Sequence, residues 1–215
     1  MTEYLHDCRK CTTRCDGKSI GTYIFEDDVA YSKRYEDMMK GLLNGRFGDN
    51  AIITAKDGYP DIAVLDGKKG MMAYVEVKAQ RRTFMSVERL LPSADLVPSE
   101  TLALNLSDLV RYFEIFDDEG VPTYVVWALA NRPCILHQTE SKLYFQDIKK
   151  LRAVYDKYGM TRRFRRKSGH GDVVDGKHKG VVVNYHFSLN ELEEDIHRLL
   201  ADLEKIVRDA DGSTA

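Results

Sequence analysis

The side chains best suited to chemistry are two carboxylates and one amine, carried by two neighbouring apolar runs. Asp61 follows Tyr59 and Pro60 at the start of the first run, whereas Glu76 and Lys78 lie two positions apart in the second. Residues two apart in a β-strand point to the same face of a sheet. If the two runs pair as strands, Asp61 lies across from Glu76, and the three side chains meet in a small volume.

Such a set is typical of a site that hydrolyses phosphodiester bonds. Carboxylates bind Mg²⁺, which prefers oxygen ligands and keeps several waters. A bound metal ion polarises the phosphate and acidifies a water, while an ammonium group can orient that water and offset developing charge. The structural alternative is a surface turn followed by a strand with a solvated Glu–Lys pair. Against it, Glu76 and Lys78 interrupt an apolar strand.

The motifs Pro60-Asp61 and Glu76-Val77-Lys78 resemble those of the PD-(D/E)xK nuclease superfamily, which includes restriction endonucleases, Holliday-junction resolvases and RecB-type exonucleases. The resemblance covers a little over half of the chain and implies a core of helix, three strands, helix and strand. It also implies that Asp61, Glu76 and the Val77 carbonyl bind Mg²⁺ or Mn²⁺, and that Lys78 is the catalytic lysine. The expected activity is metal-dependent, endonuclease-type hydrolysis of DNA.

The same resemblance implies a further acidic residue on the first helix. Glu36 is the best match, and a solvated helix face is its structural alternative. Four other acidic residues compete for this place: Glu26, Asp27, Asp28 and Asp37. Gln80 lies two residues after Lys78 and therefore on the same strand face, where it could touch a metal-bound water or a phosphate.

Hydrophobic periodicity and turn signals predict the elements that position these residues. Apolar residues near helical spacing predict a helix over 26–47. Three extended segments separated by Asp-Gly turns are predicted over 51–55, 61–65 and 71–79. Residues 81–106 contain two prolines and are expected to form mostly a long connection.

The second half of the chain continues the alternation of helices and strands. Ser107 is a predicted N-cap for a helix over 108–118, and the apolar run over 122–130 predicts a strand buried on both faces. The remaining predictions are a hairpin from 134–137 and 142–145, a helix over 147–157, a loop over 159–180, a strand over 181–187 and an amphipathic helix over 188–207.

Together these elements predict an α/β (α+β) fold with a restriction-endonuclease-like core, in which helices flank a mixed central sheet. We expect a Cys-rich N-terminal segment over 1–22 and a nuclease-like domain over 23–208, with its core at about 26–130. Residues 209–215 are expected to form a disordered tail.

Three cysteines near the N-terminus have the spacing of metal ligands: Cys8, Cys11 and Cys15. Candidates for a fourth ligand are Cys134, His6 and Asp16. Such a set suits Zn²⁺ or, with four thiolates, an iron–sulfur cluster. Some nucleases of the superfamily carry a four-Cys cluster, but with one cysteine before the nuclease motifs and three after them, the reverse of the order here. The alternatives are a reduced Cys-containing tail and a buried thiol at Cys134.

A cationic segment with an aromatic residue is the densest positive patch of the sequence. It comprises Arg162, Arg163, Phe164, Arg165, Arg166 and Lys167. Cations around an aromatic residue suit a phosphate backbone with base stacking, so we expect nucleic-acid binding here. A solvated loop that balances the acidic C-terminal helix is the alternative, and His170 behind it is more typical of polar surface.

Composition limits the remaining possibilities. A net charge of −2 excludes a globally basic nucleic-acid binder, although not a local basic patch. No apolar run is long enough for a membrane span, and the polar N-terminus predicts a cytoplasmic protein. Two alternatives to a DNA nuclease stay open: a non-catalytic nucleic-acid-binding or assembly subunit and an RNA-directed nuclease. The C-terminal helix can pack on its own domain or against a second copy or partner subunit, and its apolar stripe favours the former.

Overall fold

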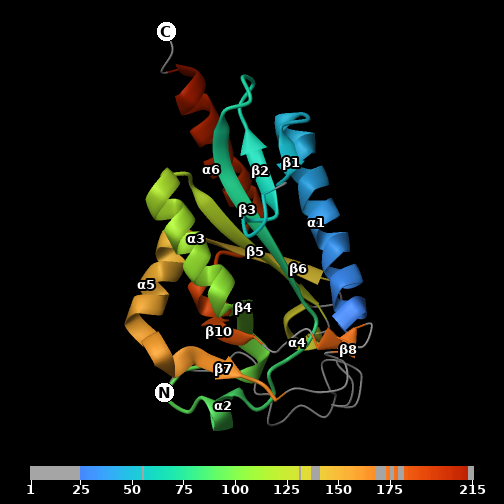
Figure 1. Ribbon diagram of the computed structural model, residues 1–215, viewed down its shortest axis with the longest axis vertical. Helices are drawn as coiled ribbons and strands as arrows, with labels where there is room; N and C mark the ends of the chain where they lie inside the picture. The colour runs from blue at the N-terminus through green and yellow to red at the C-terminus, as the bar shows by residue number, and fades with distance from the viewer. Residues whose placement is uncertain are drawn as a thin grey trace.

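The computed structural model describes residues 25–54, 56–130, 132–136, 141–167, 173–174, 177–178 and 182–212. At its centre is a five-stranded mixed sheet with strand order β1-β2-β3-β5-β6 (Figure 1). These strands are β1 (Ala51–Ile53), β2 (Ile62–Leu65), β3 (Met71–Gln80), β5 (Thr123–Ala130) and β6 (Ser141–Asp147). Only β3 and β5 are parallel; the other neighbours are antiparallel. All residues of β5 are buried, which confirms the burial on both faces predicted from its apolar run.

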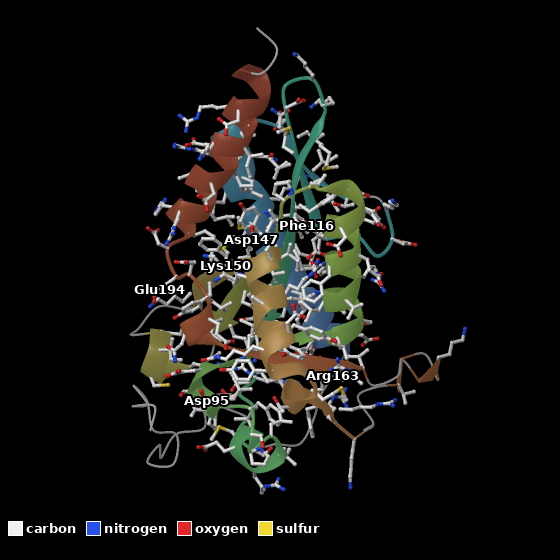
Figure 2. The ribbon with its side chains drawn as sticks, turned by 90° about the vertical axis from the view of Figure 1, so that its left-hand side faces the viewer. Asp95, Phe116, Asp147, Lys150, Arg163 and Glu194 are labelled. Atoms are coloured by element: carbon white, nitrogen blue, oxygen red, sulfur yellow. The ribbon has the colours of Figure 1, made fainter. Side chains whose placement is uncertain are left out.

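Helices cover both faces of this sheet. The long helices are α1 (Phe25–Phe47), α3 (Leu106–Glu119), α5 (Ile148–Tyr158) and α6 (Ile196–Gly212). On one face, α1 and α6 pack through apolar residues such as Met39 and Leu199. On the other face lie α3 and α5, side by side in Figure 2, where Arg152 of α5 donates to Asp117 and to the Phe113 carbonyl of α3. The predicted mixed sheet flanked by helices is therefore confirmed, and α6 packs on its own domain.

A smaller antiparallel sheet with order β4-β10-β7 lies below the central sheet in Figure 1. Its strands are β4 (Thr101–Asn105), β7 (Arg163–Arg165) and β10 (Val183–Ser188). Leu102, Leu104, Tyr185 and Phe187 join the apolar core beneath α3 and α5, so the two sheets share one core. The remaining short elements are α2 (Val87–Leu90), α4 (Pro133–Leu136), η2 (Pro98–Glu100), η3 (Gly159–Arg162), η5 (Leu189–Glu191) and the β8 (Val173–Val174) and β9 (Lys177–His178) pair.

The core order of helix, three strands, helix and strand is as predicted, with one insertion. Residues 81–106 were expected to form a long connection, but they contain α2 and β4. β4 escaped prediction because its partner β10 lies far along the chain. The helix α3 starts one residue before the predicted cap, Ser107, and ends at Glu119; Gly120 caps it with a φ of 68°, which suits glycine.

Four predictions for the second half of the chain are corrected. Residues 133–136 form the short helix α4 instead of a hairpin strand, whereas β6 pairs with β5. The segment 159–165 is not a loop but η3 followed by β7. The last helix begins at Ile196, later than predicted, because Glu193 forms two backbone hydrogen bonds with Phe145 and holds the preceding chain extended. It continues to Gly212, so the predicted tail starts no earlier than residue 213.

No helix in the described part of the chain is long and apolar enough to cross a membrane.

Candidate active site

The pairing of β2 with β3 brings the predicted acidic residues together. Ile62 lies opposite Val75, so Asp61, one residue before β2, falls beside Glu76. The Asp61 N–H donates to Glu76 Oε2 at 3.2 Å, and the Val77 N–H donates to Asp61 Oδ2 at 2.9 Å. The two carboxyl groups are therefore fixed against the backbone of each other's strand.

Lys78 completes this group from the same face of β3. Its Nζ forms an ion pair with Glu76 Oε1. Beyond Glu76, β2 no longer accompanies β3, whereas β5 continues beside it as far as Gln80. The backbone of Val77 is thus open on the β2 side, where its N–H already meets Asp61. Because the N–H and C=O of one strand residue point to the same side, the Val77 carbonyl also faces this opening.

Burial and like charge give the site its electrostatic character. Glu76 is only 1% exposed. Burial raises the pKa of Asp61 to about 7, and the charge of Glu76 adds to this rise against the opposing effects of Lys78 and the Val77 N–H. Burial alone would lower the pKa of Lys78, but the carboxylates of Glu76 and Asp61 hold it above its usual value. The amine therefore stays protonated, and the two carboxylates share a single ammonium group.

The residues present fit a hard divalent cation. Glu76 Oε1 is buried and ion-paired with Lys78, but it accepts no hydrogen bond of normal geometry, so this oxygen keeps a lone pair with which a cation beside Asp61 could be bound. No group of three or more His, Cys, Asp or Glu side chains in the described ranges could form a metal cage. Mg²⁺ does not need one, because it binds through one or two carboxylates and keeps its other positions for water and substrate phosphate. The Asp61, Glu76 and Val77 oxygens suit this mode.

Two residues of α3 belong to this environment and were missed from the sequence. Burial raises the pKa of the Tyr112 phenol, and the negative charge of Glu76 raises it further. Asp108 is near enough for its charge to act on both Lys78 and Tyr112. The available signal was their spacing of four residues, which places both on one helix face.

Glu36 lies on α1 at the edge of the site. Its charge contributes to the raised pKa of Asp61, and its side chain is bonded to Lys33 at 3.2 Å. Two competitors have other partners: Asp28 binds Arg81, and Asp37 also pairs with Lys33. The charge of Glu36 thus acts on Asp61, and its auxiliary role remains a prediction.

Gln80 is placed on the predicted face but is engaged elsewhere. Its Nε2 donates to the carbonyls of Arg82 and Thr101, and its Oε1 accepts from the Ala103 N–H at 2.8 Å. These bonds tie the end of β3 to β4. Both N–H donors of Gln80 and one lone pair of its Oε1 are therefore used within the fold, and its contact with a metal-bound water or a phosphate remains a prediction.

The cationic segment divides into a buried and an exposed part. Arg162 is 1% exposed: it donates to the Ala94 carbonyl at 3.0 Å and to Glu191 at 2.6 Å. The prediction that Arg162 contacts nucleic acid is therefore corrected, because its charge is neutralised in the interior. Phe164 is half-buried against Phe84, with ring centroids 5.0 Å apart.

The outward-facing charges of this segment are carried by Arg165 and Lys167, which are exposed. Arg163 is half-buried and bonds to the hydroxyl of Tyr155 (Arg163 is labelled in Figure 2), and Arg166 is partly exposed. Exposed cations can neutralise phosphates, whereas paired buried ones do not. The predicted nucleic-acid contact is thereby narrowed to the end of β7 and the residues after it.

The predicted cysteine site lies largely outside the described residues, which exclude Cys8, Cys11, Cys15 and His170. Cys134 is described: it lies on α4, partly buried, and packs against the core beneath α3 and α5.

Comparison with known proteins adds little to this picture. No protein-family model and no curated protein matches the chain. Among solved structures, the fold is similar to that of Hjc, a Holliday junction resolvase from Archaeoglobus fulgidus, with a TM-score of 0.42 and 14% identity over 80% of this chain and 96% of that chain.

Proposed function

We propose that the protein is a metal-dependent nuclease that hydrolyses phosphodiester bonds in DNA. The observation that carries this proposal is the convergence of Asp61, Glu76 and Lys78 where β2 ends and β3 continues. Two carboxylates that share one ammonium leave negative charge uncompensated, which favours a bound divalent cation.

In this proposal, each residue has a distinct task. Asp61 and Glu76 would hold the metal ion with the Val77 carbonyl, and Glu36 would act from the edge of the site. A divalent cation bound there supplies Lewis acidity at the phosphate and lowers the pKa of a bound water. Lys78 is held protonated by the carboxylates, so it acts as a fixed positive donor that stabilises charge on the phosphate in the transition state and does not act as a base.

Nucleic acid would be held partly by the exposed cations at the end of β7. Phe164 of β7 packs on Phe84, which follows β3 by four residues, so β7 and the strand that carries Glu76 and Lys78 are linked through packed side chains. Phosphate contacts position a substrate without reading its sequence. Arg165 and Lys167 would therefore contribute affinity, with cleavage left to the site on β3.

The test is cleavage of single-stranded, duplex and branched DNA and of RNA, with Mg²⁺, Mn²⁺ or EDTA. We expect metal-dependent cutting of DNA that falls about 100-fold or more in Glu76→Gln, since even outer partners of a metal site change activity 10- to 100-fold. Glu114→Gln is the matched control, because Glu114 is exposed on α3, and it should cut normally.

Each other outcome points to a defined alternative. Equal cutting by Glu76→Gln would show that the site is misplaced. Cutting restricted to RNA would identify an RNA-directed nuclease. Nucleic-acid binding without cutting of any substrate, by a normally folded protein, would favour a non-catalytic binding or assembly subunit.

A second metal site at the N-terminal cysteines stays a proposal from their spacing. Stoichiometric zinc by elemental analysis would support a Zn²⁺ site, and visible absorption after anaerobic purification would indicate an iron–sulfur cluster. Protein with neither signal would have reduced thiols there. The residues to substitute are Cys8, Cys11, Cys15 and Cys134.

A further inference from the structure

The loop that leads into Asp61 lies at the opening of the candidate active site. The Thr54 N–H donates to the Asp61 carbonyl at 3.0 Å, which closes the β1–β2 hairpin where Asp61 lies beside Glu76. Residues 56–60 precede Asp61 and therefore lie where β2 no longer accompanies β3. Side chains carried by this loop, or packed against it, are placed at the edge of the site.

Arg111 of α3 packs directly against this loop. Gly58 has a φ of +80°, and a Cβ added to it would lie 3.1 Å from Arg111 Cδ, so the missing side chain lets the loop backbone rest on the arginine. Arg111 Nη1 is 3.5 Å from the Gly58 carbonyl and 3.5 Å from Asp108 Oδ1. Because both contacts are long and the side chain is 44% exposed, the guanidinium keeps several of its five N–H donors for another acceptor.

Lys56 supplies a second cation on the same loop. Its Nζ lies 3.8 Å from the centroid of the Tyr59 ring and bonds to the Tyr59 hydroxyl. Tyr59 is itself fixed, because its ring packs edge-to-face on Tyr74 of β3 at 5.5 Å and its hydroxyl donates to Glu119 of α3. The exposed ammonium is thus held in place and keeps N–H donors for a ligand.

The acidic surroundings of the opening give these two cations a task. The carboxylates of the loop, of α3 and of the site are Asp57, Asp61, Glu76, Asp108 and Glu119. Nucleic acid carries one negative charge per phosphate, so these carboxylates repel it unless positive groups meet its backbone. An arginine fork can bind a phosphate through two parallel N–H groups, and a lysine binds it as a point charge.

We propose that Arg111 and Lys56 form a phosphate-binding pair that holds the nucleic-acid backbone at a nucleotide adjoining the scissile bond. This inference rests on the proposed function and adds to it the residues that hold the substrate at the site itself. Phosphate contacts fix the register of a nucleic acid without reading its bases. The pair therefore acts alike on every sequence.

The experiment measures binding of a short fluorescein-labelled DNA duplex by anisotropy in EDTA, over a series of salt concentrations. We expect the dissociation constant to rise about tenfold in Arg111→Gln, which removes a charge-assisted contact. The salt slope should fall by about one in Arg111→Gln and in Lys56→Gln, and by about two in the double variant. Lys205→Gln is the matched control, because Lys205 is exposed on α6, on the opposite face of the sheet. It should bind like wild type.

Arg111→Lys separates phosphate binding from support of the loop. Lysine keeps the charge but loses the fork, so the salt slope should equal that of wild type and the dissociation constant should rise less than in Arg111→Gln. If Arg111→Gln lowers the melting temperature but leaves the salt slope unchanged, Arg111 only supports the loop, and the proposal is overturned. The same conclusion follows if the double variant binds DNA like wild type.

Cleavage with Mg²⁺ tests the underlying function separately. Arg111→Gln should raise KM about tenfold and leave kcat nearly unchanged, because a flanking phosphate is bound equally in the ground state and the transition state. Metal-dependent cutting by wild type, with an unchanged salt slope in the double variant, would remove the phosphate-binding pair and leave the nuclease standing. A reduced slope without cutting of any substrate would support phosphate binding at this loop while the nuclease function fails. If wild type neither binds nor cuts nucleic acid, both fail.

Discussion

Replacing Asp61 by asparagine should stabilise the metal-free protein while removing its metal binding. Asparagine has nearly the same shape and can still accept the Val77 N–H, but it carries no charge beside Glu76. The pKa of Asp61 rises from 3.8 to about 7 on folding. The native state therefore binds the proton more tightly than the unfolded state. The contribution of Asp61 to the free energy of unfolding is therefore fully present at acidic pH and is lost as the pH rises from about 4 to about 7.

The size of the effect follows from the same pKa values. At about 1.36 kcal/mol per pKa unit, the rise in pKa corresponds to roughly 4 kcal/mol of destabilisation of the folded state once Asp61 is fully ionised. Asp61 is only partly buried, so solvent screening reduces this figure. We expect Asp61→Asn to increase the free energy of unfolding by about 2 kcal/mol at pH 8 and by less than about 1 kcal/mol at pH 4.

Urea unfolding with EDTA at the two pH values measures this difference. Asp156→Asn is the control, because Asp156 is exposed on α5 and should change little at either pH. Adding Mg²⁺ should then stabilise wild type but not Asp61→Asn, since a ligand stabilises only the state that binds it. The reasoning is refuted if Asp61→Asn is no more stable than wild type at pH 8, or if its gain is equally large at pH 4.

Three further results are expected. Mn²⁺ affinity should fall about tenfold per pH unit below pH 7, where Asp61 takes up a proton; calorimetry showing constant affinity from pH 8 to 6 would contradict this. Arg162→Met should lower the free energy of unfolding by about 3 kcal/mol in chemical denaturation, because it leaves the carboxylate of Glu191 without its buried partner; a change below about 1 kcal/mol would show that the pair is unimportant. Substituting Arg165 and Lys167 by glutamate should weaken DNA binding and reduce the salt slope by about one for each lost phosphate contact, and an unchanged slope in fluorescence anisotropy would exclude β7 from the interface.

The meeting of Asp61, Glu76 and Lys78 could be predicted because the three residues are close in sequence. The interval from Asp61 to Lys78 holds two runs and a turn, so strand alternation alone brings the carboxylates together. The buried strand β5 of the central sheet could also be predicted from a local pattern, because its own residues are almost all apolar.

The positions of residues whose partners lie far away in the sequence could not be predicted in this way. Tyr112 is an aromatic residue on an amphipathic helix, and only the register of α3 on β3 distinguishes it from other core residues. In the sequence, Arg162 is one cation of a basic run, but in the structure it is buried and donates hydrogen bonds to the Ala94 carbonyl and to Glu191. Neither partner is close to it in sequence.

The parallel pairing of β3 with β5 also sets the order in which the site can assemble. The β2–β3 hairpin contains Asp61, Glu76 and Lys78 and can form as soon as residue 80 is available. Its second edge has no partner until β5 has been synthesised, with residues 81–122 in between. Parallel pairings over such separations form slowly, because loop closure must precede the stabilising contacts. During synthesis on the ribosome, Asp61 and Glu76 can therefore lie together before β5 is available to cover the other edge of β3. Until β5 emerges, the nascent chain has an unpaired strand edge that is prone to incorrect pairing.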